Sequence, residues 1–505
     1  MSKYSIKQLT EKQANELGVS SDDYKTLTKV LGKEPDLAAM MLYSMIWTDK
    51  LTENDVDLLQ GVMTSNGEIG KFIHLGKGKV FYSKVKMEKS KATFSINAQK
   101  QIAYINAALE QKDQIKVYID ENKPNEGVLD INNSAIGNPF ALHFAFGTGH
   151  VPESEINKVI ADAGTSHPIA AKEEVKYEQQ VAVESVPYPD TLKEVALAIL
   201  SSPKIASRKD FFAQKGNDAF QLEDTPLVLA LTLSANSNYN SKDARKNVAV
   251  LLAEAARKLA CRGAFPIAIN TALLFNEEEG KTASKEIEEV TEGIKKFGET
   301  FNLPVTSGLI DFRKDLSQPL SVFGLAGVQG KKSITADFKS KGDLIFIIGK
   351  TVEDIDGSVY LTEFHKNNTP SAPFFDFKSE LVVHNVIRNL IDKELINAAE
   401  SCSLGGLFMA LTKMSFRNEL GFDIVTDAEI REDAYLFGES AGRVVVTVSE
   451  DVEDEFIEFM MQSGVSYTLL GHVTQGKMVV DDEHFGFIQG AKEVYNKALY
   501  KKLMQ

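Results

Sequence analysis

The chain has 505 residues, 43% of them hydrophobic and 25% charged, which is an ordinary composition for a globular protein. Because one hydrophobic core seldom supports this length, we expect two to four domains. The formal net charge is −15, from 71 acidic and 56 basic residues without a long block of one sign. Such an acidic, evenly mixed surface argues against nucleic acid or an anionic membrane as the main partner.

Cysteine usage and the N-terminus bear on the compartment. The two cysteines, Cys261 and Cys402, are too few for a disulfide framework or a zinc cluster, so we expect buried thiols in a reducing environment. Residues 1–12 are polar and lack the apolar core of a signal peptide. The strongest apolar runs, such as Leu344–Ile348, have the length of a strand. These features predict a cytoplasmic protein with no membrane partner.

The first part of the chain is predicted to be helical up to residue 60, with helices at Asp22–Val30 and Asp36–Trp47. Residues 61–185 are less regular, and the proline-bearing end of this region (165–189) has the character of a connector. Four elements are expected between residue 61 and the connector: strands at Val80–Met87, Ile115–Ile119 and Ala141–Phe146 and a helix at Ala98–Leu109.

The second part has a clearer alternation of strands and helices, but not the strict rhythm of a doubly wound sheet, which favours mixed α+β domains. We expect a boundary, open to proteases, at the loop Asn367–Pro373. The predicted strands are Leu227–Leu233, Pro266–Leu274, Pro304–Leu309, Pro319–Val328, Asp343–Gly349, Arg443–Val448 and Tyr467–Thr474. The predicted helices are Val248–Cys261, Ser284–Phe301, Ser379–Ala398, a helix opened by Gly405-Gly406, Val452–Gln462 and Gly490–Leu503.

Motifs of nucleotide and metal sites are missing from the sequence. It contains neither the glycine-rich phosphate loop that ends in Gly-Lys-Ser/Thr nor a Gly-x-Gly-x-x-Gly that opens a helix. The eight histidines do not have the spacing of metal ligands. Motifs of this kind therefore do not identify a function.

Longer stretches do carry a resemblance. Ser202–Arg208, Leu229–Leu233, Ala253–Cys261 and Gly263–Ala268 follow one another in an order and spacing similar to the second half of the synthetase subunit (PurL) of phosphoribosylformylglycinamidine synthase. The resemblance covers residues 190–500 well, 15–60 fairly and 65–185 faintly. It continues in Gly342–Ile345, Gly357–Leu361, Ser403–Leu407, Phe437–Ser440 with Gly442-Arg443, and Leu470–Val473.

The resemblance implies an α+β fold of PurM-like A and B domains, each a mixed sheet with helices. It predicts a helical N-terminal segment (1–60), a reduced first half (61–185), a complete A domain (190–335) and a complete B domain (340–505). Family members bind ATP and formylglycinamide ribonucleotide and convert the amide to an amidine with ammonia from a glutaminase partner. Such chemistry needs carboxylates for Mg²⁺, cations for phosphate and a general acid/base.

Several positions implied by the family have changed in this chain. Lys50 stands where the family carries its catalytic histidine, and an ammonium does not shuttle protons at neutral pH as imidazole does. Lys84 stands where a nucleotide-binding lysine is expected, and a strand lysine that points to solvent is the alternative. The resemblance implies a magnesium-binding strand aspartate at the position of Ser234 and two further aspartates at the positions of Thr271 and Leu404.

Gly405 and Gly406 are retained and open a helix, so their backbone N–H groups are a candidate anion seat. The alternative is that the two glycines only permit close packing. Both alternatives predict the same helix start and differ in whether an anion binds there.

Glu254 is retained, and Lys258 lies four residues later on the same face of the helix. A single carboxylate does not satisfy Mg²⁺, so we predict that Lys258 occupies the vacated metal position and pairs with Glu254 in a buried, metal-free site. The alternative is an exposed helix pair that contributes only about 0.2–0.5 kcal/mol.

These substitutions lead to two functional predictions. The first is a PurL-like protein with impaired or lost activity, acting as a structural partner in a purine-pathway assembly. The second is an active, divergent synthase whose chemistry uses Lys50, Lys84 and Glu88. ATP and Mg²⁺ are implied as cofactors if the family activity is retained, and a glutaminase subunit or a second copy of the chain is the implied partner.

Overall fold

The computed structural model describes parts of the first 162 residues and most of the chain from 179 onward. The described residues are 10–16, 20–31, 33–35, 69–70, 72–76, 79–89, 115–117, 128–131, 140–150, 161–162 and 179–503, the last without 203–204, 208–218, 222–226, 234–243, 277–279, 314–319, 368 and 370. Within this part of the chain, no helix is long and apolar enough to cross a membrane. The predicted helices at 36–47 and 98–109 lie outside the described residues.

The chain divides into two compact units that do not follow chain order. The first comprises Met1–Ile169, Gln221–Ser234 and Ile267–Ala326, and the second Ala170–Phe220, Ala235–Pro266 and Gly327–Gln505. The four domain limits predicted from the sequence therefore stay predictions.

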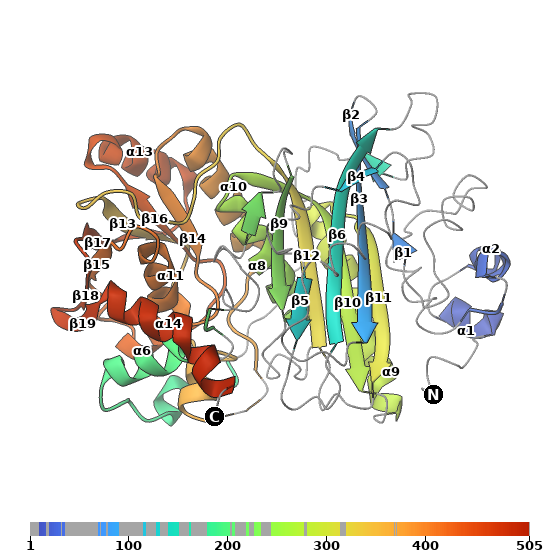
Figure 1. Ribbon diagram of the computed structural model, residues 1–505, viewed down its shortest axis with the longest axis horizontal. Coiled ribbons are helices and arrows are strands. Elements are labelled where there is room, and N and C mark those ends of the chain that lie inside the picture. The colour runs from blue at the N-terminus through green and yellow to red at the C-terminus, as the bar shows by residue number, and fades with distance from the viewer. Residues whose placement is uncertain are drawn as a thin grey trace. The chain divides into compact units, whose positions relative to one another are not determined.

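The first unit contains two six-stranded sheets (Figure 1). One has the order β1-β11-β10-β12-β9-β8; in the other, β4-β6-β3-β2-β7, β5 also pairs with β6. Strand β3 lies beside β11, so the two sheets adjoin. The elements are α1 (Glu11–Glu16), α2 (Ser21–Leu31), β1 (Ile69–Gly70), β2 (Phe72–Gly76), β3 (Lys79–Lys89), β4 (Ile115–Val117), β5 (Val128–Ile131), β6 (Phe140–His150), β7 (Ala161–Asp162), β8 (Ala219–Gln221), β9 (Leu227–Leu233), β10 (Ala264–Asn276), α9 (Gly280–Phe301), β11 (Val305–Arg313) and β12 (Leu320–Gln329).

The second unit is built around a seven-stranded sheet with the order β14-β16-β13-β17-β15-β18-β19. Most neighbouring strands are antiparallel, and β15 and β18 are parallel. The elements are α6 (Leu192–Leu200), α8 (Ala244–Ala260), β13 (Leu344–Ile348), a π-helix (Tyr360–Phe364), α10 (Phe377–Asp392), β14 (Ala398–Ser401), α11 (Gly406–Ser415), β15 (Gly421–Ile424), α12 (Glu432–Phe437), β16 (Val444–Val448), α13 (Glu453–Ser463), β17 (Tyr467–Thr474), β18 (Lys477–Val480), β19 (Glu483–Phe487) and α14 (Ile488–Leu503). Mixed sheets with helices confirm the predicted α+β class.

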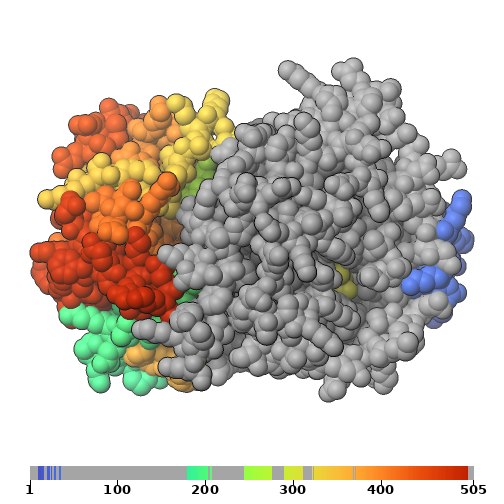
Figure 2. Space-filling model, in the orientation of Figure 1, coloured from blue at the N-terminus to red at the C-terminus, as the bar shows by residue number. Residues whose placement is uncertain are grey.

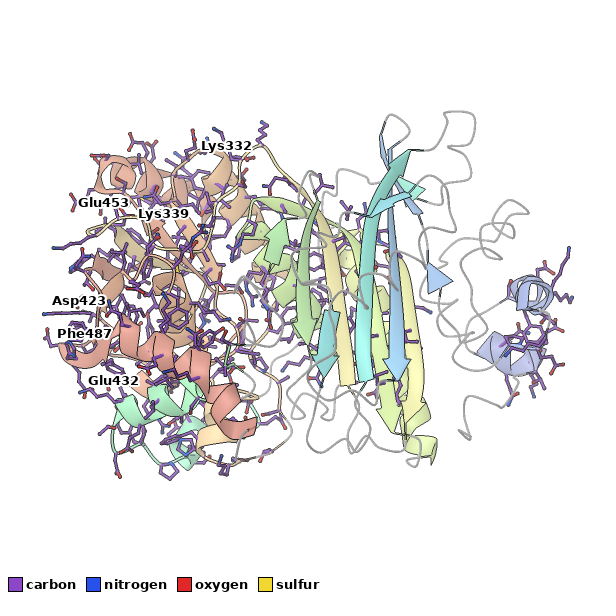
Figure 3. All side chains as sticks on the ribbon, viewed as in Figure 1. Lys332, Lys339, Asp423, Glu432, Glu453 and Phe487 are labelled. Atoms are coloured by element: carbon purple, nitrogen blue, oxygen red, sulfur yellow. The ribbon has the colours of Figure 1, made fainter. Side chains whose placement is uncertain are left out.

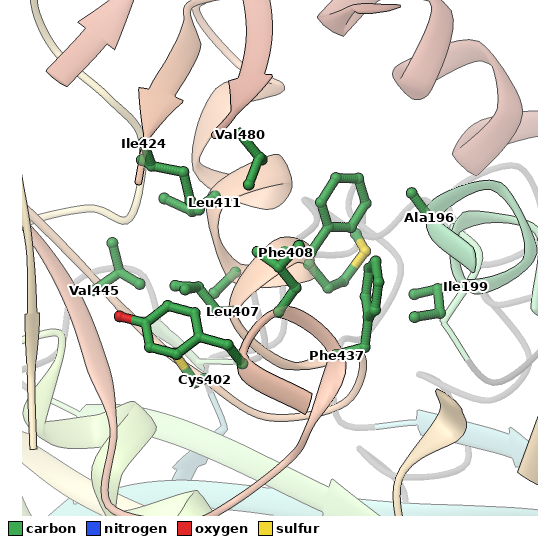
Figure 4. Close-up of a cluster of buried hydrophobic side chains, with 14 of the residues drawn as sticks. Ala196, Ile199, Cys402, Leu407, Phe408, Leu411, Ile424, Phe437, Val445 and Val480 are labelled. Atoms are coloured by element: carbon green, nitrogen blue, oxygen red, sulfur yellow. The ribbon is translucent and has the colours of Figure 1, made fainter. Parts of the chain in front are cut away.

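Strand β13 is apolar throughout because helices cover both faces of the sheet. Ile345 and Ile347 face a core shared with α6, α11, α12 and α14, part of which Figure 4 shows. Phe346 and Ile348 face a second core, formed with α10 and α13. A strand whose two faces are both buried loses the alternation of apolar and polar residues, which is why Leu344–Ile348 reads as a continuous apolar run.

The boundary predicted at Asn367–Pro373 is wrong. Strand β13 precedes this loop and β16 follows it, yet the two strands pair directly in one sheet. The end of the loop is also held in place, because the Ser371 hydroxyl accepts a hydrogen bond from the Gly357 N–H at 2.9 Å, and Ser371 is fully buried. Prolines and serines indicate a turn, but they do not show whether the turn leaves the core.

The helix predicted to extend to Ala398 ends at Asp392. Glu394 adopts a left-handed conformation (φ 60°), and the Leu395 N–H donates to the Leu390 carbonyl, which closes the helix end. The chain then continues into strand β14. The sequence lacks the glycine that usually marks such an ending.

Residues 179–190, which we call the strap, are part of the second unit instead of a free connector. Val181, Val183 and Val186 are buried in its core. The Asp356 carboxylate accepts the backbone N–H groups of Gln180 at 2.7 Å and Val181 at 3.0 Å. The surface of this segment is green in Figure 2.

Arg431 holds the other end of the strap. Its Nη1 donates to the carbonyls of Val183 at 2.6 Å and Val186 at 3.0 Å, and its guanidinium binds both carboxylate oxygens of Asp433 at 2.7 Å. Tyr188 donates to Glu432, labelled in Figure 3, at 2.6 Å. Asp433 is fully buried, and Arg431 is the cation that pairs with its carboxylate.

We predict that Arg431→Met lowers the free energy of unfolding of the second unit by about 3–5 kcal/mol, because it leaves a buried carboxylate without its cation. Lys332→Met is the control: Lys332 pairs with Glu394 at 3.0 Å, but the two side chains are 52% and 71% exposed, so we expect a loss below about 1 kcal/mol. Urea unfolding followed by circular dichroism measures both. Equal midpoints for the two variants would contradict the role of Arg431.

Candidate functional site

The residues predicted to bind ligand fall into different parts of the structure. Lys50 and Ser234 lie outside the described residues. Lys84 lies in β3 of the first unit, opposite Ala145 of β6. Glu254 and Lys258, in α8, and Gly405 and Gly406, at the start of α11, belong to the second unit.

Helix α11 begins at Gly406, where the sequence predicts a helix start, and both glycines have left-handed backbones (φ 81° at Gly405 and 66° at Gly406). A Cβ at Gly405 would lie 2.8 Å from the Cβ of Met409, and one at Gly406 would lie 2.5 Å from the Gly438 carbonyl oxygen. Both distances are too short for a carbon atom to fit without displacing its neighbours. Close packing is therefore sufficient to require the two glycines.

A carboxylate of the chain itself sits at this helix start. Glu439 Oε1 accepts the backbone N–H of Gly405 at 2.8 Å and that of Val359 at 2.8 Å. The Glu439 side chain is buried, so these donors compensate for part of its desolvation. The N–H of Gly405 is thus used internally, and the anion-seat alternative loses one of its donors. Glu439 lies in one of the stretches that carry the family resemblance, but the sequence does not predict its contact with Gly405.

We predict that Gly406→Ala lowers the free energy of unfolding by at least about 2 kcal/mol, because it combines left-handed strain with a steric clash. Gly490→Ala, at an open position in the first turn of α14 where an added Cβ meets nothing within 4 Å, should be neutral or stabilising by up to about 1 kcal/mol. Urea unfolding compares them. Stabilisation of the unmodified protein by inorganic phosphate, lost in Gly406→Ala, would instead support an anion seat.

Glu254 and Lys258 form an ion pair in α8. Lys258 Nζ lies 2.6 Å from Glu254 Oε1, and the two side chains are 8% and 13% exposed. The helix buries almost all of its residues from Asn247 onward, so both charges are largely withdrawn from water. The pair has the geometry predicted from the sequence, and its part in ligand binding stays a prediction.

Beside this pair lies a buried charge network that sequence reasoning missed. The Arg257 guanidinium pairs with Glu380 of α10, donates to the Ser401 hydroxyl at 2.8 Å and reaches the Cys402 carbonyl at 3.4 Å. The other Glu380 oxygen lies 2.9 Å from His384 Nε2. Since a carboxylate only accepts hydrogen bonds, His384 carries its proton on Nε2. No local pattern connects Arg257 with Glu380, which is 123 residues away.

Burial and pairing act in opposite directions on these groups. Burial would raise the pKa of Glu380, but the Arg257 guanidinium and the His384 hydrogen bond lower it to about 2. Burial lowers the pKa of His384 by more than the Glu380 carboxylate raises it. Burial would lower the pKa of Arg257, but Glu380 and Glu254 raise it overall. The network at neutral pH therefore consists of an ionised arginine, an ionised glutamate and a neutral histidine.

These pKa shifts predict acid sensitivity. Because the folded pKa of His384 is depressed, the unfolded chain binds more protons below about pH 6.5, and stability falls as the pH drops through that range. Glu380 adds a further loss between about pH 4.5 and its folded value of about 2. We expect His384→Gln to flatten the dependence of Tm on pH between 7.5 and 5, whereas His472→Gln, at an exposed site in β17, should keep the original profile. Parallel profiles for all three proteins would contradict this assignment.

The described residues at the predicted metal positions do not fit a magnesium ion. Leu404, at one family aspartate position, packs its side chain against the apolar core. Thr271, at another, is fully buried in β10 with no hydrogen-bond partner for its hydroxyl among the described residues. Glu254 is already paired with Lys258. Within the described ranges, no group of three or more His, Cys, Asp or Glu side chains could hold a metal ion.

Comparison with known families identifies two matching domains. Residues 217–328 match the N-terminal domain of AIR synthase related protein, and residues 340–482 match its C-terminal domain. The two ranges span about half of the chain.

Curated relatives are phosphoribosylformylglycinamidine synthase subunits PurL. That of Moorella thermoacetica is 30% identical over 315 residues, which are 58% of this chain and 43% of the relative. That of Methanothermobacter marburgensis is 30% identical over 365 residues, or 66% of this chain and 50% of the relative. The chain thus spans about half the length of these relatives.

Two solved structures from Thermotoga maritima are also similar. PurL complexed with FGAR has a TM-score of 0.48 at 17% identity and covers 60% of this chain and 54% of its own. PurLQS has a TM-score of 0.49 at 16% identity and covers 61% and 52%. With its family domains at residues 217–328 and 340–482, the chain belongs to the AIR synthase related family and is a PurL-like protein of mixed α+β, PurM-like fold.

Proposed function

We propose that this chain is a PurL-like protein of purine biosynthesis whose ATP-dependent amidine-forming activity is impaired or lost, and that it acts as a partner in an assembly. The observation that carries this proposal is the charge arrangement in α8: the carboxylate retained from the family's metal site, Glu254, is neutralised by Lys258 at 2.6 Å. Leu404, where the resemblance implies an aspartate, packs against the apolar core, which supports the same conclusion.

The partner proposed is a glutaminase subunit or a second copy of the chain. The curated relatives are named as subunits, and one solved relative is described as PurLQS. The chain retains both AIR synthase related domains, whereas the predicted site residues have changed. This combination is compatible with a structural role, because the surfaces of a fold can persist when its chemistry changes. ATP and Mg²⁺ would be cofactors only under the alternative function.

The alternative is an active, divergent phosphoribosylformylglycinamidine synthase. One observation is compatible with it: Lys84 and Glu88 lie four residues apart in the backbone of the long strand β3. A cation and a carboxylate in that register could bind phosphate and assist proton transfer, with Lys50 as a third group.

We predict that the purified chain, supplied with formylglycinamide ribonucleotide, ATP, Mg²⁺ and ammonia, forms no amidine above background. A missing general acid/base alone usually lowers the rate by about 10²–10⁴-fold. The PurL of Moorella thermoacetica, assayed in parallel, serves as the positive control. Robust turnover that Lys84→Ala abolishes would establish the alternative function instead.

A further inference from the structure

The Glu254–Lys258 pair differs from an ordinary surface pair in its surroundings and not in its geometry. Glu493 and Lys497 in α14 have the same four-residue spacing and the same 2.6 Å separation, but their side chains are 63% and 59% exposed. The side chains of Glu254 and Lys258 are 13% and 8% exposed. Water therefore screens the α14 pair strongly and the α8 pair weakly.

The charges next to the α8 pair balance within the protein. Lys258 and Arg257 contribute two positive charges, and Glu254 and Glu380 contribute two negative charges. His384 completes the network with a hydrogen bond to Glu380 and is neutral at pH 7. The four charged groups Lys258, Arg257, Glu254 and Glu380 therefore balance one another.

A divalent cation would disturb this balance. Mg²⁺ prefers six oxygen ligands and usually takes one or two carboxylates together with water and phosphates. At Glu254 it would meet the Lys258 ammonium at the carboxylate and the Arg257 guanidinium nearby, and it would add two positive charges to a largely buried, neutral cluster.

We infer that the Lys258 ammonium takes the place of a divalent cation at Glu254. No metal ion then binds at this face of α8, and any nucleoside diphosphate that binds there does so independently of Mg²⁺. The inference rests on the proposed function in taking Glu254 as the retained site carboxylate. It adds that a nucleoside diphosphate bound at this face would bind independently of Mg²⁺.

Thermal unfolding of the full chain tests this inference. The Tm of the unmodified protein should be the same in EDTA and in millimolar MgCl₂, with or without ADP, once ionic strength is matched with NaCl. Lys258→Gln should lower Tm by about 5 °C or more, because a largely buried carboxylate loses its partner. MgCl₂ together with ADP, whose phosphates supply further oxygen ligands, should restore part of that loss, and NaCl with ADP should not.

Lys497→Gln is the matched control, since it removes the lysine of the exposed pair with the same geometry. It should change Tm by less than about 1 °C and show no magnesium response. The double variant Glu254→Gln/Lys258→Gln should be more stable than Lys258→Gln alone, because it leaves no unpaired charge. If Lys258→Gln does not fold, recovery of a folded protein in the double variant supports the same conclusion.

Three outcomes would overturn the inference. They are a magnesium-specific rise in the Tm of the unmodified protein that Glu254→Gln removes, a Lys258→Gln variant as stable as Lys497→Gln, or a double variant no more stable than Lys258→Gln. Amidine formation is not a readout of this experiment. If the melting experiments contradict the inference and no amidine is formed, the inference is wrong and the proposed function stands. If amidine is formed, the proposed function is wrong whatever the melting experiments show.

Discussion

The packing of the second unit depends on one constraint: each charged side chain in its interior must have an opposite charge or a hydrogen-bond partner close to it. Arg257, Glu380 and His384 come from two helices, α8 and α10, and Ser401 from strand β14. Removing one member of such a network leaves its partner charged in a region without water, which costs far more than the intact pairs contribute. The network therefore joins the two helices and the strand through groups that lie far apart in the sequence.

The same requirement governs the backbone at the helix starts. Glu439 accepts two backbone N–H groups, and the fully buried Arg443 donates to the carbonyls of Gly438 and Ser440. The loop between α12 and β16 is consequently fixed from both sides. Gly406 can approach that loop closely only because it lacks a Cβ. Features that look like a ligand site in the sequence here satisfy the chain's own polar groups.

The proposed function rests on how these internal pairings differ from what the resemblance implies for the family. A magnesium–nucleotide site keeps carboxylates available, whereas this chain pairs Glu254 with Lys258 and packs Leu404 against an apolar core. The AIR synthase related domains are retained because their apolar strands and helices still form the same layers. Under the proposed function, the fold persists although these groups no longer serve a metal site.

Local pattern was sufficient to predict much of the fold. The apolar strands β10, β13 and β16, the helices α8 and α9 and the helix start at Gly406 all follow from periodicity and glycine placement, since these signals act within a few residues. The four-residue spacing of Glu254 and Lys258 likewise determined that they could pair. Only the tertiary structure decided that the pair is buried, that Arg257 meets Glu380, that the strap packs into the core and that Asn367–Pro373 is no boundary. Those outcomes depend on contacts between residues far apart in the chain. The residues on either side of a charged or proline-bearing position do not indicate such contacts.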